Sequence, residues 1–384
     1  LVSIEMSSQS RMTAQLIEDP TPHALAQQKM QPSRSPKVAV VVLNYNGLKW
    51  LSKCLSSIMR TNWSKLDVYV VDNASTDKSV QIIRKQFPKV KLICHSTNLG
   101  YAAGYNRALK KIKAHYIVLL NTDTEILNSM WVESMVRAAT TNTGIAAVAC
   151  KMVSMQNPRR LNSVGVMGIP FWRGFVDIGK EELDEEQYDN AKFEPFSFCG
   201  GAVLINRSIF EEAGGFDARF FMYVEDVDLS WRLRILGYRI AYAPEAVVAH
   251  SFSGMETVGF RKFYLCHRNL LRAILKNCGP SLNNALFCYF LFSLTAGLGF
   301  IPLDPGKTVA IGKAIFWNLL NLRDSYSLRL AIQSSRRESD EKQILSIMYP
   351  KIRRYQPTEY ASFRRILDII FEHQRSRYAF RKSM

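Results

Sequence analysis

The sequence feature that most constrains the fold is a short apolar run that stops abruptly at acidic residues. Residues 116–120 are uncharged and mostly apolar, and Asp123 and Glu125 follow directly. A run of this length between segments of helical periodicity is typical of a buried parallel strand. In an open α/β sheet, ligands bind beyond the carboxyl ends of the strands. Two interpretations follow: Asp123 points into a ligand crevice, where a carboxylate can hold a divalent cation, or Asp123 or Thr124 caps the next helix.

Three similar units precede this strand, each with the order strand, polar turn and helix. The patterns predict strands at 38–43, 66–71 and 90–94, with helices after each. Four such units predict an α/β fold with a doubly wound, mostly parallel sheet flanked by helices. No Gly-x-Gly-x-x-Gly follows the first strand, which counts against a dinucleotide-binding dehydrogenase.

Two further motifs lie in the second half of the chain. Gly200 and Gly201 interrupt a strand pattern at 196–205, which suggests close approach by a ligand or another backbone. Glu225, Asp226 and Asp228 open a predicted helix, where acidic side chains interact well with the helix dipole. Capping needs only one carboxylate, so the surplus favours a role in proton abstraction.

The two ends of the chain differ from the middle in composition. Residues 1–36 are rich in Gln, Ser, Pro and Met, and we expect a disordered N-terminal tail there. Residues 261–384 are mostly helical in pattern and carry 21 Lys and Arg against 8 Asp and Glu, within a chain of net charge +17. This excess favours an anionic partner: a lipid surface, a phosphate-bearing substrate or nucleic acid.

Within the basic region, residues 285–303 form a stretch of nineteen residues without a charge. This is just long enough for a membrane span. Gly297, Gly299 and Pro302 interrupt it, so the pattern favours a membrane-associated hairpin or interfacial helix over a straight span. A buried helix of a soluble domain is the remaining alternative.

Five motifs, taken together in this order, resemble those of glycosyltransferase family 2, and the likeness covers residues 37–255. The motifs are VVLNYNG at 41–47, VDNASTD at 71–77, NLGYAAGYN at 98–106, LLNTDTE at 119–125 and YVEDVDLSWRLRILG at 223–237. The most similar branch is the bacterial rhamnosyltransferase-like one that builds cell-surface polysaccharide. The resemblance implies a Rossmann-like GT-A catalytic domain at 37–260, followed by a helical, membrane-associated region at 261–384.

The resemblance also implies a nucleotide site and a metal site. Asp72 would accept the imide N–H of a uracil or thymine ring, because a carboxylate can only accept. Gly100 and Gly104 would let the backbone approach the nucleotide. The residues placed around the nucleotide are Asn44, Asn46, Asp72, Asn98, Gly100, Gly104 and Asn121. Asp123 would bind Mg²⁺ or Mn²⁺. His250 is a candidate second ligand, with a structural role as the alternative.

For the reaction, the resemblance implies that Asp226 is the base that deprotonates the acceptor hydroxyl, with Glu225 the neighbour most easily confused with it. Gly200, Gly201 and Arg232 would contact the acceptor or the diphosphate; for Arg232 an ion-pair role is the alternative. Trp172 and Trp231 could stack on sugars, although core packing is the expected use of both.

The predicted function is therefore that of an inverting, metal-dependent glycosyltransferase, peripheral or monotopic at the cytoplasmic face of the plasma membrane. The branch resemblance favours rhamnose from dTDP-rhamnose as the donor sugar. The acceptor would be a cell-surface polysaccharide or a lipid-linked saccharide, and no nucleic-acid partner is expected. The alternative is a basic membrane-surface or nucleic-acid binding protein with a non-catalytic GT-A domain.

Overall fold

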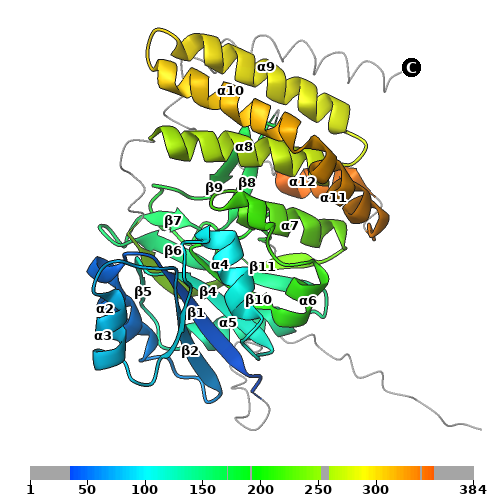
Figure 1. The fold of residues 1–384 in the computed structure, drawn as a ribbon. Coiled ribbons are helices and arrows are strands. Elements are labelled where there is room, and N and C mark those ends of the chain that lie inside the picture. The colour runs from blue at the N-terminus through cyan, green and yellow to red at the C-terminus, as the bar shows by residue number, and fades with distance from the viewer. Residues whose placement is uncertain (1–34, 171, 191–192, 252–258, 338–339, 350–384) are drawn as a thin grey trace, which may run out of the picture. The chain divides into compact units, whose positions relative to one another are not determined.

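A computed structural model describes residues 35–170, 172–190, 193–251, 259–337 and 340–349 (Figure 1). The tail expected at 1–36 lies almost wholly outside the described residues, as does the basic end of the chain from 350 onward. The described residues from Pro36 onward belong to one compact unit.

The centre of this unit is a nine-stranded sheet, accompanied by a separate two-stranded hairpin. The strands are β1 (Val38–Asn44), β2 (Leu66–Asp72), β3 (Lys91–Cys94), β4 (Tyr116–Asn121), β5 (Thr124–Ile126), β6 (Ile145–Ser154), β7 (Leu161–Ser163), β8 (Val166–Ile169), β9 (Gly174–Asp177), β10 (Ala202–Asn206) and β11 (Arg239–His250). The strands expected at 38–43, 66–71, 90–94 and 116–120 are confirmed to within two residues.

The sheet is mixed, so the expectation of a mostly parallel sheet is correct only for its first half. The strand order is β3-β2-β1-β4-β10-β6-β11-β5, with β7 paired to β6. Strands β3, β2, β1 and β4 are mutually parallel, whereas β10 runs antiparallel to both β4 and β6. The antiparallel strand follows a long excursion that includes the β8–β9 hairpin, and no local pattern in the sequence signals its direction.

Helices cover the sheet and then extend beyond it. They are α2 (Leu48–Ile58), α3 (Ser79–Gln86), α4 (Gly100–Leu109), α5 (Trp131–Thr140), α6 (Arg207–Glu212), the short 3₁₀ turn η2 (Ala218–Phe220), α7 (Glu225–Ile235), α8 (Phe260–Asn277), α9 (Leu282–Phe300), α10 (Pro305–Leu320), α11 (Leu322–Ser334) and α12 (Glu341–Met348). Alternate residues of the central strands pack into the core; Val41 and Leu119 meet Tyr105 of α4 and Leu229 of α7 in one buried cluster.

Helix α8 joins the sheet-bearing part to the later helices through a buried polar face. Lys276 pairs with Asp217 at 2.6 Å and with Asp228 at 3.0 Å, and Arg272 also binds Asp217, at 2.8 Å. Asn277 donates to Asp228 at 2.8 Å. These cations and acids are almost fully enclosed, and a buried charge is tolerated only when it is paired and hydrogen-bonded. We call these five residues the α8 ion cluster.

Beyond α8, the helices α10 and α9 lie one after the other on the side away from α7 (Figure 1). Trp317 of α10 stacks on the guanidinium of Arg268, and Asn318 donates to the Arg268 carbonyl at 2.9 Å. By length and composition, α9 is the one helix in the described ranges that is long and apolar enough to cross a membrane. Since a core helix of a soluble protein can pass the same test, membrane association is not established by this feature.

Candidate functional site

The carboxyl ends of three parallel strands bring the predicted site residues to one edge of the sheet. Asn44 at the end of β1 lies opposite Asp72 at the end of β2, and Leu43 lies opposite Asn121 at the end of β4. Neighbouring strands are about 4.8 Å apart, so Asp72 and Asn121 are separated by roughly 10 Å. The Asn121 amide donates to the Gly201 carbonyl at 2.9 Å, which places the paired glycines beside this edge.

Asp72 is buried and held by its neighbours in a fixed orientation. One oxygen accepts from the Asn44 side-chain amide at 2.9 Å, and the other accepts from the Ser75 backbone amide at 3.0 Å. Each oxygen has a second lone pair, so the carboxylate can still accept a donor from a ligand. Asn44 Oδ1 is buried without a hydrogen-bond partner among the described residues, and a buried acceptor in that state favours binding a donor.

Asn46 and Asn98 organise the loops around this carboxylate. Asn46 adopts a left-handed backbone (φ 50°), and its side-chain oxygen accepts from the Thr76 amide at 2.8 Å. Asn98 Oδ1 accepts from the Asn73 side chain and from the Gly100 amide, both at 2.9 Å. Both asparagines therefore have structural partners in the loops where the resemblance places the nucleotide.

Gly100 and Gly104 make close contacts with protein rather than open space for a nucleotide. Gly100 has φ +75°, and a Cβ there would overlap the carbonyl and ring of Phe221. A Cβ on Gly104 would lie 3.2 Å from Leu43 and 3.4 Å from Asn73. Both glycines therefore have a packing reason, because they allow helix α4 to approach the 221 loop and the ends of β1 and β2. Their expected role beside the nucleotide stays a prediction.

Asp123 lies directly beyond β4 and faces His250 at the end of β11. The Asp123 Oδ1 to His250 Nε2 distance is 3.3 Å, and both side chains are mostly buried. The other ring nitrogen, Nδ1, is 3.0 Å from Asn162 Oδ1, an acceptor, so Nδ1 donates its hydrogen there. Nε2 then faces the carboxylate. This donor set suits a divalent cation that completes its shell with ligand oxygens, because a histidine ligand is normally oriented by such an outer partner.

The two carboxyl groups at the start of α7 differ sharply in environment. Asp226 is half-buried and accepts from the Gly200 amide at 2.9 Å and the Val227 amide at 2.8 Å. Burial raises the pKa of Asp226 to about 6, although these two amide bonds lower it. Glu225 is buried, and burial together with the neighbouring Asp226 raises its pKa well above the usual range. Burial therefore favours the protonated form of Glu225, whereas Asp226 ionises above pH about 6, which makes Asp226 the better candidate for the base.

The third acid of this motif, Asp228, has a structural role. It is fully buried and belongs to the α8 ion cluster, and it also pairs with Arg232 at 3.0 Å. The three acids thus divide into an accessible carboxylate, a buried carboxyl with a raised pKa and an ion-paired carboxylate. Because Asp228 is used for ion pairing, only Asp226 and Glu225 remain as the surplus carboxylates that the sequence associated with proton abstraction.

The loop before α7 is held in an unusual backbone conformation. Phe221, Tyr223 and Val224 all have left-handed φ values, of 63°, 72° and 70°. For aromatic and β-branched residues this costs roughly 1–3 kcal/mol each and persists only where the surroundings enforce it. The Phe221 carbonyl accepts from the Tyr101 amide of α4 at 2.6 Å. Asn269 of α8 donates its side-chain amide to the carbonyls of residues 220, 222 and 223, at 3.0, 2.9 and 2.7 Å.

Gly200 and Gly201 are constrained by side chains. The Tyr101 hydroxyl donates to the Gly200 carbonyl at 2.6 Å, and a Cβ on Gly200 would lie 3.0 Å from that hydroxyl and 3.4 Å from Asp226. A Cβ on Gly201 would lie 2.6 Å from Met152. The sequence suggested close approach by a ligand or another backbone, and the structure shows side chains close to both glycines.

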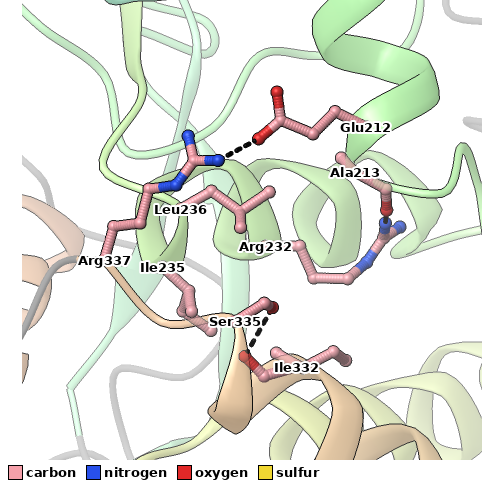
Figure 2. Close-up of a pocket in the computed structure, with 8 residues that line it drawn as sticks. All are labelled: Glu212, Ala213, Arg232, Ile235, Leu236, Ile332, Ser335 and Arg337. Atoms are coloured by element: carbon pink, nitrogen blue, oxygen red, sulfur yellow. Dashed lines mark hydrogen bonds and ion pairs between the residues drawn. The ribbon is translucent and has the colours of Figure 1, made fainter.

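Arg232 lies in a different place from the other site residues. Its guanidinium binds Asp228 and the carbonyls of Ala213 and Gly215. Figure 2 shows the bond to the Ala213 carbonyl. It lines a pocket of about 340 Å³ at the far end of α7, together with Glu212 and Arg337. Since α7 rises about 1.5 Å per residue, Arg232 is roughly 9 Å along the helix from Asp226. The ion-pair alternative is therefore what the structure shows, with four of the five guanidinium N–H groups bound to protein acceptors, and the expected contact with the diphosphate stays a prediction.

Trp172 and Trp231 stack on each other with ring centres 5.6 Å apart, and both are buried, so their expected core role is confirmed. Sequence reasoning missed the functions of Asn73, Tyr101 and Asn162. Asn73 and Tyr101 lie inside recognised motifs and could have been found there. Asn162 has no local signal, because only the folded chain brings it to His250.

Comparison with known proteins agrees with this geometry. Residues 39–214 match the model of Glycosyl transferase family 2. The chain is 27% identical over 237 residues to N-acetylglucosaminyl-diphospho-decaprenol L-rhamnosyltransferase of Mycobacterium tuberculosis, which covers 55% of this chain and 75% of that protein. It is 25% identical over 224 residues to the O-antigen biosynthesis protein RfbC of Myxococcus xanthus, covering 56% of this chain and 17% of that protein.

Solved structures share the fold at low sequence identity. GalNAc-T7 with UDP, GalNAc and Mn²⁺ has a TM-score of 0.54 at 13% identity, covering 77% of this chain and 59% of that chain. S. aureus TarS in complex with UDP has a TM-score of 0.50 at 19% identity, covering 81% and 90%. The mixed sheet flanked by helices is a GT-A fold. The protein is a glycosyltransferase whose residues 39–214 match the family 2 model, and it is similar to rhamnosyltransferases.

Proposed function

We propose that the protein is an inverting, metal-dependent transferase that moves rhamnose from dTDP-rhamnose to a saccharide acceptor linked to a membrane lipid. The observation that carries the reaction type is the position of Asp226, which accepts from the Gly200 amide at the sheet edge that also holds Asp72 and Asp123. Similarity to the mycobacterial rhamnosyltransferase supports the sugar and the lipid-linked acceptor.

In the proposed donor site, Asp72 accepts the imide N–H of a thymine or uracil base. The carboxylate is fixed by Asn44 and Ser75, so little reorganisation is needed when the base binds. The buried acceptor Asn44 Oδ1 adds to the preference for a ligand that brings donors. Asp123 and His250 would hold a divalent cation, Mg²⁺ or Mn²⁺, which supplies positive charge beside the diphosphate.

In the proposed transfer step, Asp226 takes the proton of the acceptor hydroxyl. The resulting oxygen forms a bond to the anomeric carbon as the bond from that carbon to the diphosphate oxygen breaks, and the diphosphate leaves with the electron pair. A single displacement of this kind inverts the anomeric configuration. The amides of Gly200 and Val227 stabilise the ionised carboxylate before the reaction and hold it in place.

Purified full-length protein, Mn²⁺ and a prenyl-diphospho-N-acetylglucosamine acceptor would test this proposal against a panel of donors. Release of nucleoside diphosphate is expected with dTDP-rhamnose, at a much higher rate with the acceptor than by slow hydrolysis without it. Asp226→Asn should lower the rate by a factor on the order of 10³, whereas the exposed control Glu211→Gln should leave it unchanged. Strict use of a guanosine donor would refute the assignment of Asp72, and retained activity of Asp226→Asn would refute the assignment of the base.

The proposed location is the cytoplasmic face of the plasma membrane, as a peripheral or monotopic protein. The name of the mycobacterial relative includes a decaprenol-linked acceptor, and an enzyme using such an acceptor must reach a membrane surface. Fractionation of cells should therefore recover the protein with membranes, and recovery entirely in the soluble fraction would contradict this part of the proposal.

A further inference from the structure

Exposed apolar side chains are concentrated on α9, α10 and α11 and on the turns that join these helices. Of the twenty-one large apolar side chains that are exposed in the described part of the chain, fourteen lie between residues 287 and 330. Leu294 and Leu298 of α9 are 61% and 59% exposed, and Phe316 and Leu319 of α10 are each 61% exposed. Soluble monomers rarely expose apolar side chains at this density, so the surface indicates a binding partner. We call it the α9–α11 surface.

The opposite side of α9 is packed against its neighbours, which fixes the direction that the exposed side faces. Ala285, Tyr289 and Ser293 are buried and recur at helical spacing. The Tyr289 hydroxyl donates to the carbonyl of His267 on α8 at 3.2 Å, and the Thr308 hydroxyl of α10 donates to the Gly297 carbonyl at 2.8 Å. Only 28% of the most apolar part of α9 is buried. Helix α9 is therefore docked along one side and apolar on the other.

Basic side chains border the α9–α11 surface. Arg261 at the start of α8, Lys313 on α10 and Arg323 on α11 are exposed. The only acidic residues between 259 and 334 are Asp304 and Asp324, and both are paired with cations, Asp304 with Lys307 and Asp324 with Arg272. An apolar face bordered by Lys and Arg is the pattern of a helix that lies in the headgroup region of an anionic bilayer.

We propose that the α9–α11 surface docks on an anionic lipid surface, with α9 and α10 lying in the membrane plane instead of crossing the bilayer. The side-on contacts of Tyr289 and Thr308 support this orientation, because a spanning α9 would have to leave α8 and α10. Only the purpose of this docking rests on the proposed function: it would bring the sheet edge to a lipid-linked acceptor.

Flotation of the full-length protein with vesicles tests the proposal. The wild-type protein should float with vesicles of equal parts phosphatidylglycerol and phosphatidylcholine and bind pure phosphatidylcholine more weakly. The variant Leu294→Gln/Leu298→Gln/Phe316→Gln/Leu319→Gln should lower the partition onto anionic vesicles by roughly tenfold or more. All four positions are exposed, and circular dichroism checks the fold. Leu127→Gln/Leu183→Gln, also at exposed positions, is the matched control and should bind like the wild type.

A second variant separates the charge contribution. Lys313→Glu/Arg323→Glu should weaken binding to anionic vesicles while leaving binding to phosphatidylcholine unchanged. Absence of wild-type flotation, or flotation unaffected by the four Gln substitutions, would overturn the proposal. So would resistance to carbonate extraction, which indicates a spanning helix. A dimer that the four substitutions convert to monomer, without vesicle binding, would assign the surface to a second copy.

Donor hydrolysis, measured without an acceptor, distinguishes failure of this inference from failure of the proposed function. The four-residue variant should still release nucleoside diphosphate at the wild-type rate, because the altered side chains lie on α9 and α10 and not at the sheet edge. A protein that hydrolyses the donor but does not bind vesicles would leave the transferase proposal intact. A protein that binds vesicles but has no turnover with any donor would leave the docking surface intact.

Discussion

The contact between Asn269 and the loop before α7 leads to a quantitative prediction for Asn269→Ala. The Asn269 amide carries two hydrogens and lies within bonding distance of three loop carbonyls. The loop itself contains three residues with left-handed φ, of which Val224 immediately precedes the helix that carries Asp226. Removing the amide takes away the side chain that holds these carbonyls, so the loop should relax toward ordinary backbone conformations.

The magnitude follows from the number of hydrogen bonds. Two buried bonds contribute about 1 kcal/mol each, and more when their carbonyls are left unsatisfied, for a total of about 2–4 kcal/mol. If Asp226 is correctly placed only in the strained loop conformation, kcat/KM should fall by roughly 30- to 1,000-fold, since about 1.4 kcal/mol corresponds to tenfold. Asp226 should also become more exposed, so the acid limb of its pH profile should move below pH about 6.

Asn318→Ala is the matched control. Asn318 is equally buried and donates its side-chain amide to two backbone carbonyls, both at 2.9 Å, but it has no hydrogen bond to the loop among the described residues. It should lower thermal stability to a similar degree and leave the pH profile unchanged. Steady-state kinetics over pH 5–9 and thermal unfolding of both variants would provide the comparison. Equal losses of activity in the two variants, with no movement of the acid limb for Asn269→Ala, would refute the positioning role.

Three further predictions concern the site itself. The wild-type kcat/KM should decline as pH falls below about 6, because the Asp226 base becomes protonated. The pKa of Asp226 is raised in the folded protein, so ionisation of Asp226 at higher pH destabilises the fold. Chemical denaturation of Asp226→Asn should therefore show a free energy of unfolding about 1 kcal/mol larger than that of the wild type at pH 8, with no such increase at pH 4. Asp123→Ala should weaken Mn²⁺ binding at least tenfold in calorimetry with dTDP present, whereas Asp67→Ala, a control outside the site, should not. Gly100→Ala should destabilise by about 1–3 kcal/mol more than Gly214→Ala, because both have positive φ but only Gly100 meets Phe221; equal melting temperatures would contradict the clash.

Much of the parallel half of the sheet could be predicted from local patterns. Strands β1 and β4 are continuous apolar runs, and β2 is mostly apolar apart from Asp67; all three end at Asn or Asp. A strand covered on both faces needs apolar side chains, and polar residues begin where the sheet edge meets solvent. The later strands were harder. β11, for example, is one strand with a register shift between Ala243 and Val247.

For the site, the sequence identified the acidic residues by their type and position, but it could not predict which of them the fold would bury and so which pKa values would be raised. Glu225 and Asp226 are adjacent in sequence, and only the fold buries one and exposes the other to the sheet edge. Similarly, Arg232 lies in a motif of the resemblance, yet its donors are taken by Asp228 and two carbonyls. The Asn162 contact with His250 joins positions 88 residues apart, which no spacing rule reaches.

The α8 ion cluster sets a limit on how the chain can be divided. A cut after residue 260, at the boundary that composition suggests, would remove Lys276 and Arg272 and leave Asp217 without its cations, and Asp228 with Arg232 alone. Stranding one buried partner in this way costs about 3–5 kcal/mol, a large part of the stability of an ordinary domain. The sheet and helix α8 are therefore expected to fold and unfold as one cooperative unit, and shortened versions of this enzyme must keep α8 to remain folded.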